Sequence, residues 1–342
     1  MSFLSEIREQ PQALMRLADK QIAEGGYLAL KNFIAPIKPK RVLFSGMGSS
    51  FIASEFCSAY LQTQGLDALT IESGEVSDSN IEYFGGYDLL VAVSQSGKSK
   101  ELVSLCERLK GKLPILAVTN DLSKPLAPLG NYVFEICSGV ELFTASKSYT
   151  NTLGALLIIA RVLLSQGDAL AALYTDFRNC HNEMDSLISD EKTPKRLAAA
   201  IQDHMNYTMI GSGYSYCTAW DAVFVASEAA KVFTGAFTTG QFLHGPTEII
   251  CNRFAYFVFD TDCAHRSAAR DCIRLILQNG GKVIHIHTQT DLLQDNNYCG
   301  VCLPALPCEM MPILEIILVE LIVNEVGLRK GIVPGALQFV EK

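Results

Sequence analysis

The sequence predicts an α/β protein in which two parallel β-sheets are each covered by helices on both faces, after a helical N-terminus. First, strand-like and helix-like segments alternate along most of the 342 residues. Second, the strand-like segments are apolar throughout, which is typical of parallel strands buried on both faces. Third, one strand–loop–helix pattern occurs twice, as RVLFSGMGSSFIASEF at 41–56 and YTMIGSGYSYCTAWDA at 207–222. The repeat predicts an internal duplication into two similar halves.

The elements follow from apolar spacing, beginning with two helices in the first 35 residues. In the first half, strands are expected at 41–46, 67–73, 87–97 (a strand with its loop), 114–120 and 132–138, and helices at 51–65, 99–111 and 148–166. After a polar helical stretch at about 165–205, strands are expected at 207–213, 254–260 and 281–287, and helices at 215–233, 268–281 and 310–326. The predicted organisation is N-terminal helices at 1–35, a first domain at 36–195, a second domain at 196–330 and a tail at 331–342.

The composition indicates a globular protein. Hydrophobic residues make up 49% and charged residues 19% of the chain, which suits packed cores and argues against disorder. The net charge is -8 and no basic block occurs, so nucleic acid is not an expected partner. The N-terminus lacks the features of a secretory signal, so a cytoplasmic protein is expected. Glu315, Glu320 and Glu325 interrupt the apolar stretch 310–326, which predicts a buried helix and no membrane span.

The cysteines and histidines predict no metal site. The eleven cysteines are scattered and odd in number, which is typical of free thiols in a reducing compartment. Cys299 and Cys302 have CxxC spacing, but only Cys308 is near enough to add a ligand, so buried or half-buried thiols are expected. His285 and His287 share one face of a strand without a carboxylate or third histidine beside them, which favours a polar strand end.

Two loops rich in serine and glycine follow apolar strands of the first half, SGMGSS at 45–50 and SQSGKS at 94–99. Ligands of open parallel sheets bind beyond the carboxyl ends of the strands. A helix N-terminus offers unpaired N–H groups, serine adds hydroxyl donors and glycine allows close approach, so the two loops predict a phosphate cradle. Either loop alone could be an ordinary helix cap or turn. Neither matches GxGxxG or GxxxxGK[ST], and Lys98 is expected to be solvated.

Four segments together resemble the SIS (sugar isomerase) family: SGMGSS, VAVSQSGKSKE, ELFTASKSYTNTLGALL and SEAAKVFTGAFTTGQFLHGP. More narrowly, they resemble the isomerase half of glutamine–fructose-6-phosphate aminotransferase and stand-alone phosphosugar isomerases, deaminases and deglycases. The similarity covers almost the whole chain from about residue 40. It implies two tandem SIS-type subdomains, each a three-layer αβα sandwich with a flavodoxin-like parallel sheet.

The resemblance implies that the first half binds a sugar phosphate and the second half supplies catalytic groups. The family's phosphate ligands fall on Ser50, Ser94, Gln95, Ser96 and Ser99, with Ser49 alongside. The strand at 254–260 is followed by TDCAHRS, so the second half is expected to lack a phosphate cradle of its own.

Glu228 and His244 align without a gap with the family's catalytic glutamate and histidine. Interconverting a ketose and an aldose moves a proton between C1 and C2, which a positioned carboxylate can carry. Histidine exchanges protons near neutral pH, as ring opening needs. From the residues alone, Glu228 could be a solvated helix acid and His244 a turn residue. In the family this histidine reaches the neighbouring subunit's active site, which implies a homodimer, and no metal or organic cofactor is required.

Two positions depart from the family pattern. Lys147 matches a characteristic family lysine, but Ala145 stands where the family has a substrate-contacting serine. A gap-free match from Pro334 places Phe339 where the family has a lysine that contacts the open-chain sugar. Lys342 could fill that role if two residues are inserted.

The resemblance therefore implies a stand-alone phosphosugar isomerase, deaminase or deglycase that acts at C1–C2 of a hexose 6-phosphate carrying nitrogen. The chain is too short to include a glutaminase domain as well, and deaminase or deglycase is the favoured subtype. The alternative is a non-catalytic sugar-phosphate sensor, which in this family usually carries a helix-turn-helix domain. The first 35 residues are too few for such a domain. The sequence does not identify the sugar or the amine.

Overall fold

The computed structural model describes residues 2–165, 169–289 and 293–339. The chain divides into two compact units. The N-terminal unit contains residues 9–141 and the described residues of 147–181, and the C-terminal unit contains the described residues of 1–8, 142–146 and 182–341. The short segment 142–146 thus packs in the C-terminal unit, although the sequence on both sides of it belongs to the N-terminal unit.

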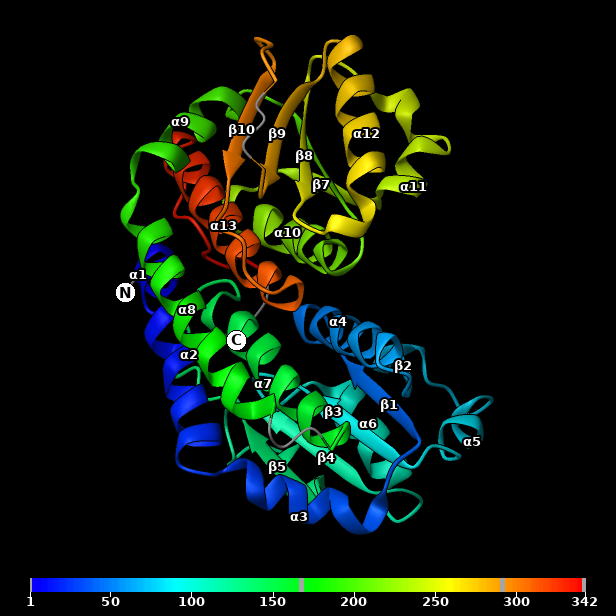
Figure 1. Cartoon of the computed structure of the whole chain (residues 1–342). Coiled ribbons are helices and arrows are strands. Elements are labelled where there is room, and N and C mark those ends of the chain that lie inside the picture. The colour runs from blue at the N-terminus through cyan, green and yellow to red at the C-terminus, as the bar shows by residue number, and fades with distance from the viewer. Residues whose placement is uncertain (1, 166–168, 290–292, 340–342) are drawn as a thin grey trace. The chain divides into compact units, whose positions relative to one another are not determined.

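The N-terminal unit is built on a parallel sheet with the strand order β2-β1-β3-β4-β5 (Figure 1). Its strands are β1 (Arg41–Gly46), β2 (Asp67–Glu72), β3 (Leu89–Val93), β4 (Ile115–Thr119) and β5 (Tyr132–Glu135). One face is covered by α4 (Ser49–Thr63) and α7 (Lys147–Leu163), and α7 also contacts α2 (Gln10–Ala18) and α3 (Tyr27–Ile37). The other face packs in a hydrophobic core with α5 (Ile81–Phe84) and α6 (Lys100–Leu109).

The C-terminal unit has a second parallel sheet with the order β10-β9-β8-β6-β7. Its strands are β6 (Asn206–Gly211), β7 (Phe233–Thr238), β8 (Phe254–Asp260), β9 (Lys282–His287) and β10 (Tyr298–Cys302). One face packs on α10 (Tyr214–Ala230), which in turn contacts α13 (Met311–Arg329); α13 also contacts α1 (Phe3–Arg8) and α9 (Lys192–Ile201). The other face packs on α11 (Thr239–Leu243) and α12 (Arg266–Gln278) (Figure 1). Helix α8 (Ala169–Ser189) contributes residues to both units.

The two sheets have the same topology. When strands are numbered within each sheet, both have the order 2-1-3-4-5, which is the flavodoxin-like order. The predicted fold class of two three-layer αβα sandwiches after a helical N-terminus is therefore confirmed. The origin of this likeness in a duplication stays a prediction, as do the domain boundaries.

Helix α10 and strand β7 differ from the expectation, and strand β10 was likewise not predicted as a strand. The helix expected at 215–233 ends at Ala230, because Lys231 adopts a left-handed conformation with φ +51° that stops the helix. The next residues form β7, an edge strand of sequence FTGAFT that was not predicted. Its glycine and threonines give it none of the continuous apolar character of strands such as β3 and β8.

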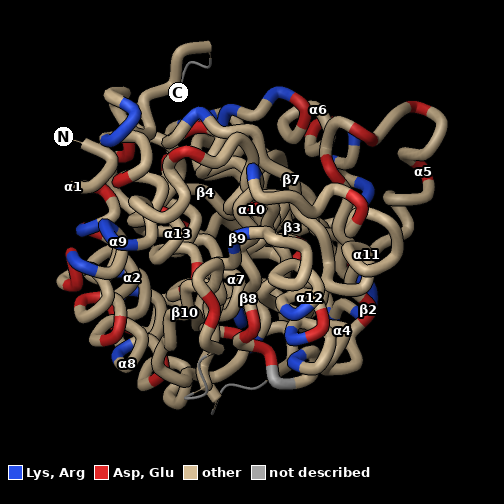
Figure 2. Tube along the Cα trace, turned by 90° about the horizontal axis from the view of Figure 1, so that it is seen from above, with Lys and Arg blue, Asp and Glu red and all other residues tan. Residues whose placement is uncertain are grey.

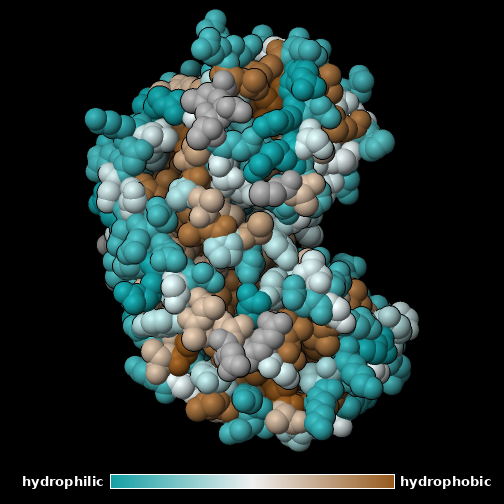
Figure 3. All heavy atoms as spheres, in the orientation of Figure 1, coloured by the Kyte–Doolittle hydropathy of each residue, from teal (hydrophilic) through white to brown (hydrophobic). Residues whose placement is uncertain are grey.

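The surface and the late apolar helix agree with a globular chain. Among the described residues, no helix is long and apolar enough to cross a membrane. Hydrophilic residues predominate on the face shown in Figure 3. Helices α6 and α8 carry basic and acidic residues together (Figure 2).

Candidate functional site

The two serine-rich loops lie at the carboxyl ends of neighbouring strands in the N-terminal unit. β1 pairs with β3 in parallel, with Ser45 opposite Ala92. β2 lies on the other side of β1, and β4 on the other side of β3. The chain therefore reverses its direction of winding between β1 and β3, and this switch point is where flavodoxin-like sheets bind their ligands.

The first loop turns tightly from β1 into α4. Gly46 is packed so closely that a Cβ there would lie 2.9 Å from the Val93 carbonyl oxygen. Gly48 is the N-cap of α4 with φ +53°, a conformation that favours glycine, and the space beside it is open. Ser49 and Ser50 form the first turn of α4 and are half-buried. Their hydroxyls and the helix N-terminus are thus available together to an anion.

The second loop connects β3 to α6 and is held by its own hydrogen bonds. The buried Ser94 hydroxyl lies 3.0 Å from the Ser99 hydroxyl and accepts the Gly97 N–H at 3.2 Å. The Gln95 carbonyl accepts the Asn120 N–H at 3.1 Å. Ser99 is the N-cap of α6.

All six predicted phosphate ligands thus lie on two adjacent loops at the switch point. Those with half-buried side chains are Ser49, Ser50, Gln95, Ser96 and Ser99. Lys98 is exposed, as expected.

Glu228 lies in the last turn of α10 in the C-terminal unit and is half-buried. Its Oε2 accepts a hydrogen bond from the Thr144 hydroxyl. Its carbonyl oxygen accepts the Lys231 ammonium at 2.7 Å. The sequence analysis missed Thr144 as a neighbour of this carboxylate, because that contact depends on tertiary structure. It also missed Lys231, which is only three residues from Glu228 in the sequence and contacts its backbone carbonyl.

His244 directly follows α11, and its side chain is exposed. A capping box between Thr238 and Gln241 fixes the start of α11 at the carboxyl end of β7. Glu228, in contrast, precedes the amino end of β7. The six residues of β7 span about 20 Å, so Glu228 and His244 of one chain lie near opposite ends of this strand.

The carboxyl ends of the second sheet carry acids in place of the hydroxyls. The strand register makes Asp260 and Asp262 the counterparts of Ser94 and Ser96. Gly213, the N-cap of α10, has φ +59° and ψ -135°, against +53° and -132° for Gly48. A Cβ at Gly213 would lie 1.9 Å from Asp262 Oδ2. This helix N-terminus is therefore occupied by the chain's own carboxylate, which disfavours phosphate.

His285 and His287 lie at the end of β9 and are stacked at 4.4 Å. His285 bonds through Nε2 to Asp260 at 3.3 Å and through Nδ1 to the Tyr298 hydroxyl at 2.7 Å. The expectation that no carboxylate lies beside these histidines is therefore wrong, because the strand register places Asp260 opposite His287. His287 Nδ1 accepts the Gln289 N–H at 3.1 Å. Burial and the neighbouring His285 lower the pKa of His287 to about 4. These histidines thus belong to a hydrogen-bonded network, and in the described part of the chain no three His, Cys, Asp or Glu residues form a metal-binding group.

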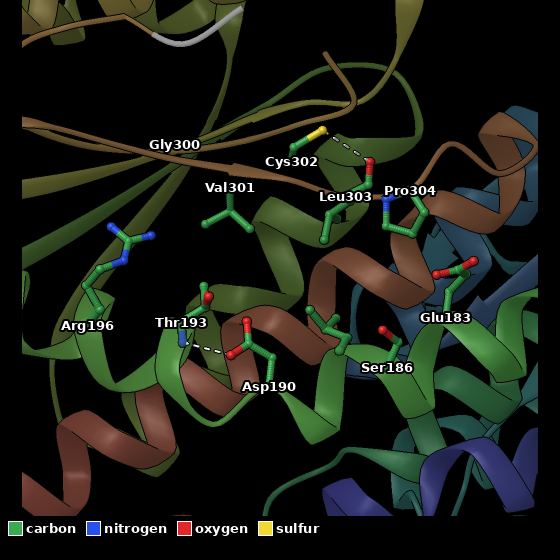
Figure 4. Close-up of a pocket in the computed structure, with 11 residues that line it drawn as sticks. Glu183, Ser186, Asp190, Thr193, Arg196, Gly300, Val301, Cys302, Leu303 and Pro304 are labelled. Carbon is green, nitrogen blue, oxygen red and sulfur yellow. Dashed lines mark hydrogen bonds between the residues drawn. The ribbon is translucent and has the colours of Figure 1, made fainter. Parts of the chain in front are cut away.

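The expectation of buried or half-buried thiols holds for Cys299 but is wrong for Cys302, which is exposed. Cys302 is the last residue of the edge strand β10, where no further strand covers it. It lines a cavity of about 340 Å³ between α8, α9 and β10, with Glu183, Asp190 and Arg196 (Figure 4). None of the predicted site residues lines this cavity.

Of the two lysines that the family pattern identified, the structure describes one. Lys147 begins α7 in the N-terminal unit, is buried, and pairs with Glu9. Lys342 lies outside the described residues. Phe339, which replaces the family lysine in the gap-free match, is 95% exposed.

Comparisons with known proteins agree with this description. Residues 37–161 match the family model of the SIS domain. The chain is 24% identical over 334 residues to glutamine–fructose-6-phosphate aminotransferase [isomerizing] of Pyrococcus horikoshii, covering 96% of this chain and 55% of the relative. It is 31% identical over 163 residues to arabinose 5-phosphate isomerase KpsF of Escherichia coli, covering 46% and 49%. The chain thus spans about half the length of these curated relatives.

The structure of the C-terminal domain of glucosamine-fructose-6-phosphate aminotransferase from Francisella tularensis is similar over 96% of both chains, with a TM-score of 0.86 and 18% identity. The class defined by the fold is therefore a doubly-wound α/β protein with two like sheets. The match to the SIS-domain model covers residues 37–161, which include the whole sheet of the N-terminal unit. The predicted resemblance to the isomerase half of the aminotransferase is confirmed.

Proposed function

We propose that this protein is a phosphosugar-converting enzyme that moves a proton between C1 and C2 of a hexose 6-phosphate. One observation carries the proposal: two hydroxyl-rich loops flank the β1–β3 switch point of the SIS domain, each beside a helix N-terminus. In this proposal Ser49, Ser50, Ser94, Gln95, Ser96 and Ser99 hold the phosphate through hydroxyls, an amide and backbone N–H groups. Phosphate binding leaves C1 and C2 as the reacting end of the sugar.

Glu228 is the proposed proton carrier. A carboxylate takes the proton from one carbon and returns it to the other, acting first as base and then as acid. In a deaminase or deglycase the same shuttle gives an imine, and addition of water to its carbon breaks the C–N bond and leaves a carbonyl; the proposed His244 would give a proton to the departing amine. The replacement of the family serine by Ala145 and of the tail lysine by Phe339 supports a substrate different from that of the aminotransferase.

We further propose that the active form is a homodimer in which His244 serves the site of the second copy. Glu228 and His244 of one chain lie near opposite ends of β7, which is too far apart for both to reach one sugar carbon. In a two-fold dimer the same surface patch is used by both copies, so each histidine could reach the partner's site.

Turnover tests the proposal. Fructosamine 6-phosphates, glucosamine 6-phosphate, and fructose 6-phosphate with ammonia are each incubated with the protein, and sugar and amine products are followed. The expected result is turnover of at least one substrate, with loss of more than about 1,000-fold in Glu228→Gln. The control Glu107→Gln changes an exposed acid of α6 and should keep full activity. Binding of every candidate without turnover, together with unchanged affinity in Glu228→Gln, would support the sensor alternative instead.

Mixing two inactive variants tests the dimer. When Glu228→Gln and His244→Ala proteins are unfolded and refolded together in equal amounts, mixed dimers contain one site with both native residues. About a quarter of the wild-type activity should return, because half of the dimers are mixed and half of their sites are native. No recovery in a mixture shown to contain mixed dimers would contradict the sharing of His244.

A further inference from the structure

Thr144 brings a buried hydroxyl to Glu228 from a distant part of the chain. Its side chain is 1% exposed, and its Oγ1 donates to Glu228 Oε2. The segment 142–146 that carries it belongs to the C-terminal unit, whereas residues on both sides of the segment belong to the N-terminal unit. The chain thus enters the C-terminal unit for five residues, and one of these contacts the candidate proton carrier.

The backbone of this segment is fixed at each residue that precedes the contact. The buried Glu6 carboxylate of α1 accepts the Leu142 N–H at 2.6 Å and the Phe143 N–H at 3.2 Å. The Thr144 N–H donates to the Gly335 carbonyl oxygen at 3.0 Å. Hydrogen bonds from three successive backbone N–H groups therefore hold the backbone that carries the Thr144 hydroxyl.

The end of α10 and the C-terminal segment are joined a second time by Lys231. Its ammonium donates to the Glu228 carbonyl oxygen at 2.7 Å and to the Ala336 carbonyl oxygen at 2.8 Å. Gly335, between the two connections, has φ +71°, and a Cβ there would lie 2.9 Å from the Phe3 ring. Thr144 and Lys231 thus each connect Glu228 to residues 335–336.

We propose that Thr144 is a positioning residue for Glu228. Its hydroxyl holds Oε2, so that the carboxylate keeps one orientation and Oε1 is the oxygen that exchanges the proton. Its backbone N–H ties this orientation to the C-terminal segment at Gly335. A carboxylate that can rotate spends less time in the orientation that proton transfer requires, which lowers the rate without changing how the phosphate is held. The catalytic consequence rests on the proposed function of Glu228.

The kinetic test compares Thr144→Val with Thr144→Ser. Valine keeps the shape of threonine and lacks the hydroxyl, whereas serine keeps the hydroxyl. Thr144→Val should lower kcat by about 10- to 100-fold, the range for loss of one hydrogen bond to a charged group, with KM within about 3-fold. Thr144→Ser should stay within about 3-fold of wild type in kcat. Thr70→Val serves as the control, since Thr70 also gives its hydroxyl to a side chain, Ser58, in the N-terminal unit at 2.9 Å.

A double-mutant cycle tests the contact without substrate. Tm is measured for Thr144→Val, Glu228→Ala and the double variant. Because both single changes remove the same hydrogen bond, the double variant should lose less Tm than the sum of the single losses. Additive losses would overturn the inference, whatever the activity is.

The two measurements separate the two proposals. Coupled losses of Tm with no turnover of any sugar phosphate by the wild type would overturn the proposed function and leave Thr144 as the residue that fixes Glu228. Coupled losses with unchanged kcat in Thr144→Val would show that the contact stabilises the fold only, and would overturn the positioning role.

Discussion

The helix N-termini that follow β1 and β6 have almost the same backbone conformation, but their side-chain surroundings differ. In the N-terminal unit, the space beside Gly48 is open and Ser50 is half-buried. In the C-terminal unit, Asp262 fills the space beside Gly213. Ser215, which has the same helix position as Ser50, donates to the buried Glu315 at 2.7 Å. The first helix N-terminus thus has open space beside it, whereas the second lies beside the chain's own acids.

This difference shows that one topology can surround its helix N-termini with different side chains. Helix N-termini attract anions wherever they occur. A fold that repeats the same strand–loop–helix unit therefore repeats the attraction, and a unit that binds no anion can satisfy it with its own acids. Asp262 and Glu315 provide this, and the proposed chemistry of the C-terminal unit uses Glu228 at the other end of α10.

The largest expected effect comes from replacing Ser94 and Ser96 by aspartate, the residue type at the equivalent positions of the C-terminal unit. Ser94→Asp combined with Ser96→Asp places two carboxylates at a site proposed for phosphate, so like charges repel and hydroxyl donors are lost. Affinity for a sugar phosphate should fall by more than 100-fold, measured by isothermal titration calorimetry. Ser79→Asp, which adds an acid at an exposed position of the same unit, should leave the affinity within about 2-fold. Retained affinity in the double variant would show that phosphate binds elsewhere.

The second prediction concerns the stability of the C-terminal unit against pH. The pKa of His287 is lowered to about 4 by burial and by His285, with a smaller effect of Arg266 in the same direction and an opposing effect of Asp260. The unfolded state therefore binds this proton from about pH 6.5 downward and the folded state only near pH 4, so stability is lost as pH falls. The loss approaches about 3 kcal/mol over this window.

The comparison with His287→Asn isolates this effect. Asparagine can still accept the Gln289 N–H and does not titrate. The comparison is needed because burial raises the pKa of Glu315, and this carboxyl makes stability fall as pH rises above the unfolded pKa. Urea unfolding from pH 4 to 7 should show a smaller increase of stability with pH in the variant. Equal slopes for wild type and variant would contradict the assignment to His287.

The fold could be predicted because its signals are local. Continuous apolar strands such as 89–93 and 254–258 and the repeated glycine loops carry the topology in sequence order. β7 was missed because FTGAFT packs at an edge and needs few apolar residues. The two serine-rich loops could be identified for the same local reason, since each is one strand end and one helix start.

The surroundings of Glu228 could not be predicted because they depend on contacts between distant segments. Thr144 is 84 residues from Glu228 in the sequence, and Ala336 lies 105 residues from Lys231. No periodicity or motif relates such positions. Asp262 likewise looks like a solvated loop acid until the register of β8 places it beside Gly213.

The third prediction removes the internal acid from the second cradle. Asp262→Asn keeps the shape of the side chain, and its oxygen can still accept the Ala264 N–H that Asp262 accepts at 2.9 Å. The loss of negative charge at the start of α10 should cost about 1 kcal/mol in the free energy of unfolding, measured by urea titration. Asp203→Asn, an exposed acid before β6, is the matched control and should change stability by less than about 0.5 kcal/mol. A variant as stable as wild type would mean that Asp262 does not stabilise this helix end.

The smallest expected effect tests whether the open cradle needs a side-chain cation. Lys98 is the basic residue within the second loop, and its side chain is exposed. An exposed ammonium is screened by salt and adds little, whereas the proposed grip consists of hydroxyls and helix N–H groups. Lys98→Ala should therefore weaken sugar phosphate binding by no more than about 3-fold at 0.15 M salt. A loss of 30-fold or more would mean that phosphate binding in the N-terminal unit depends on the charge of Lys98. The difference between the two units would then rest on Lys98 as well as on the serines.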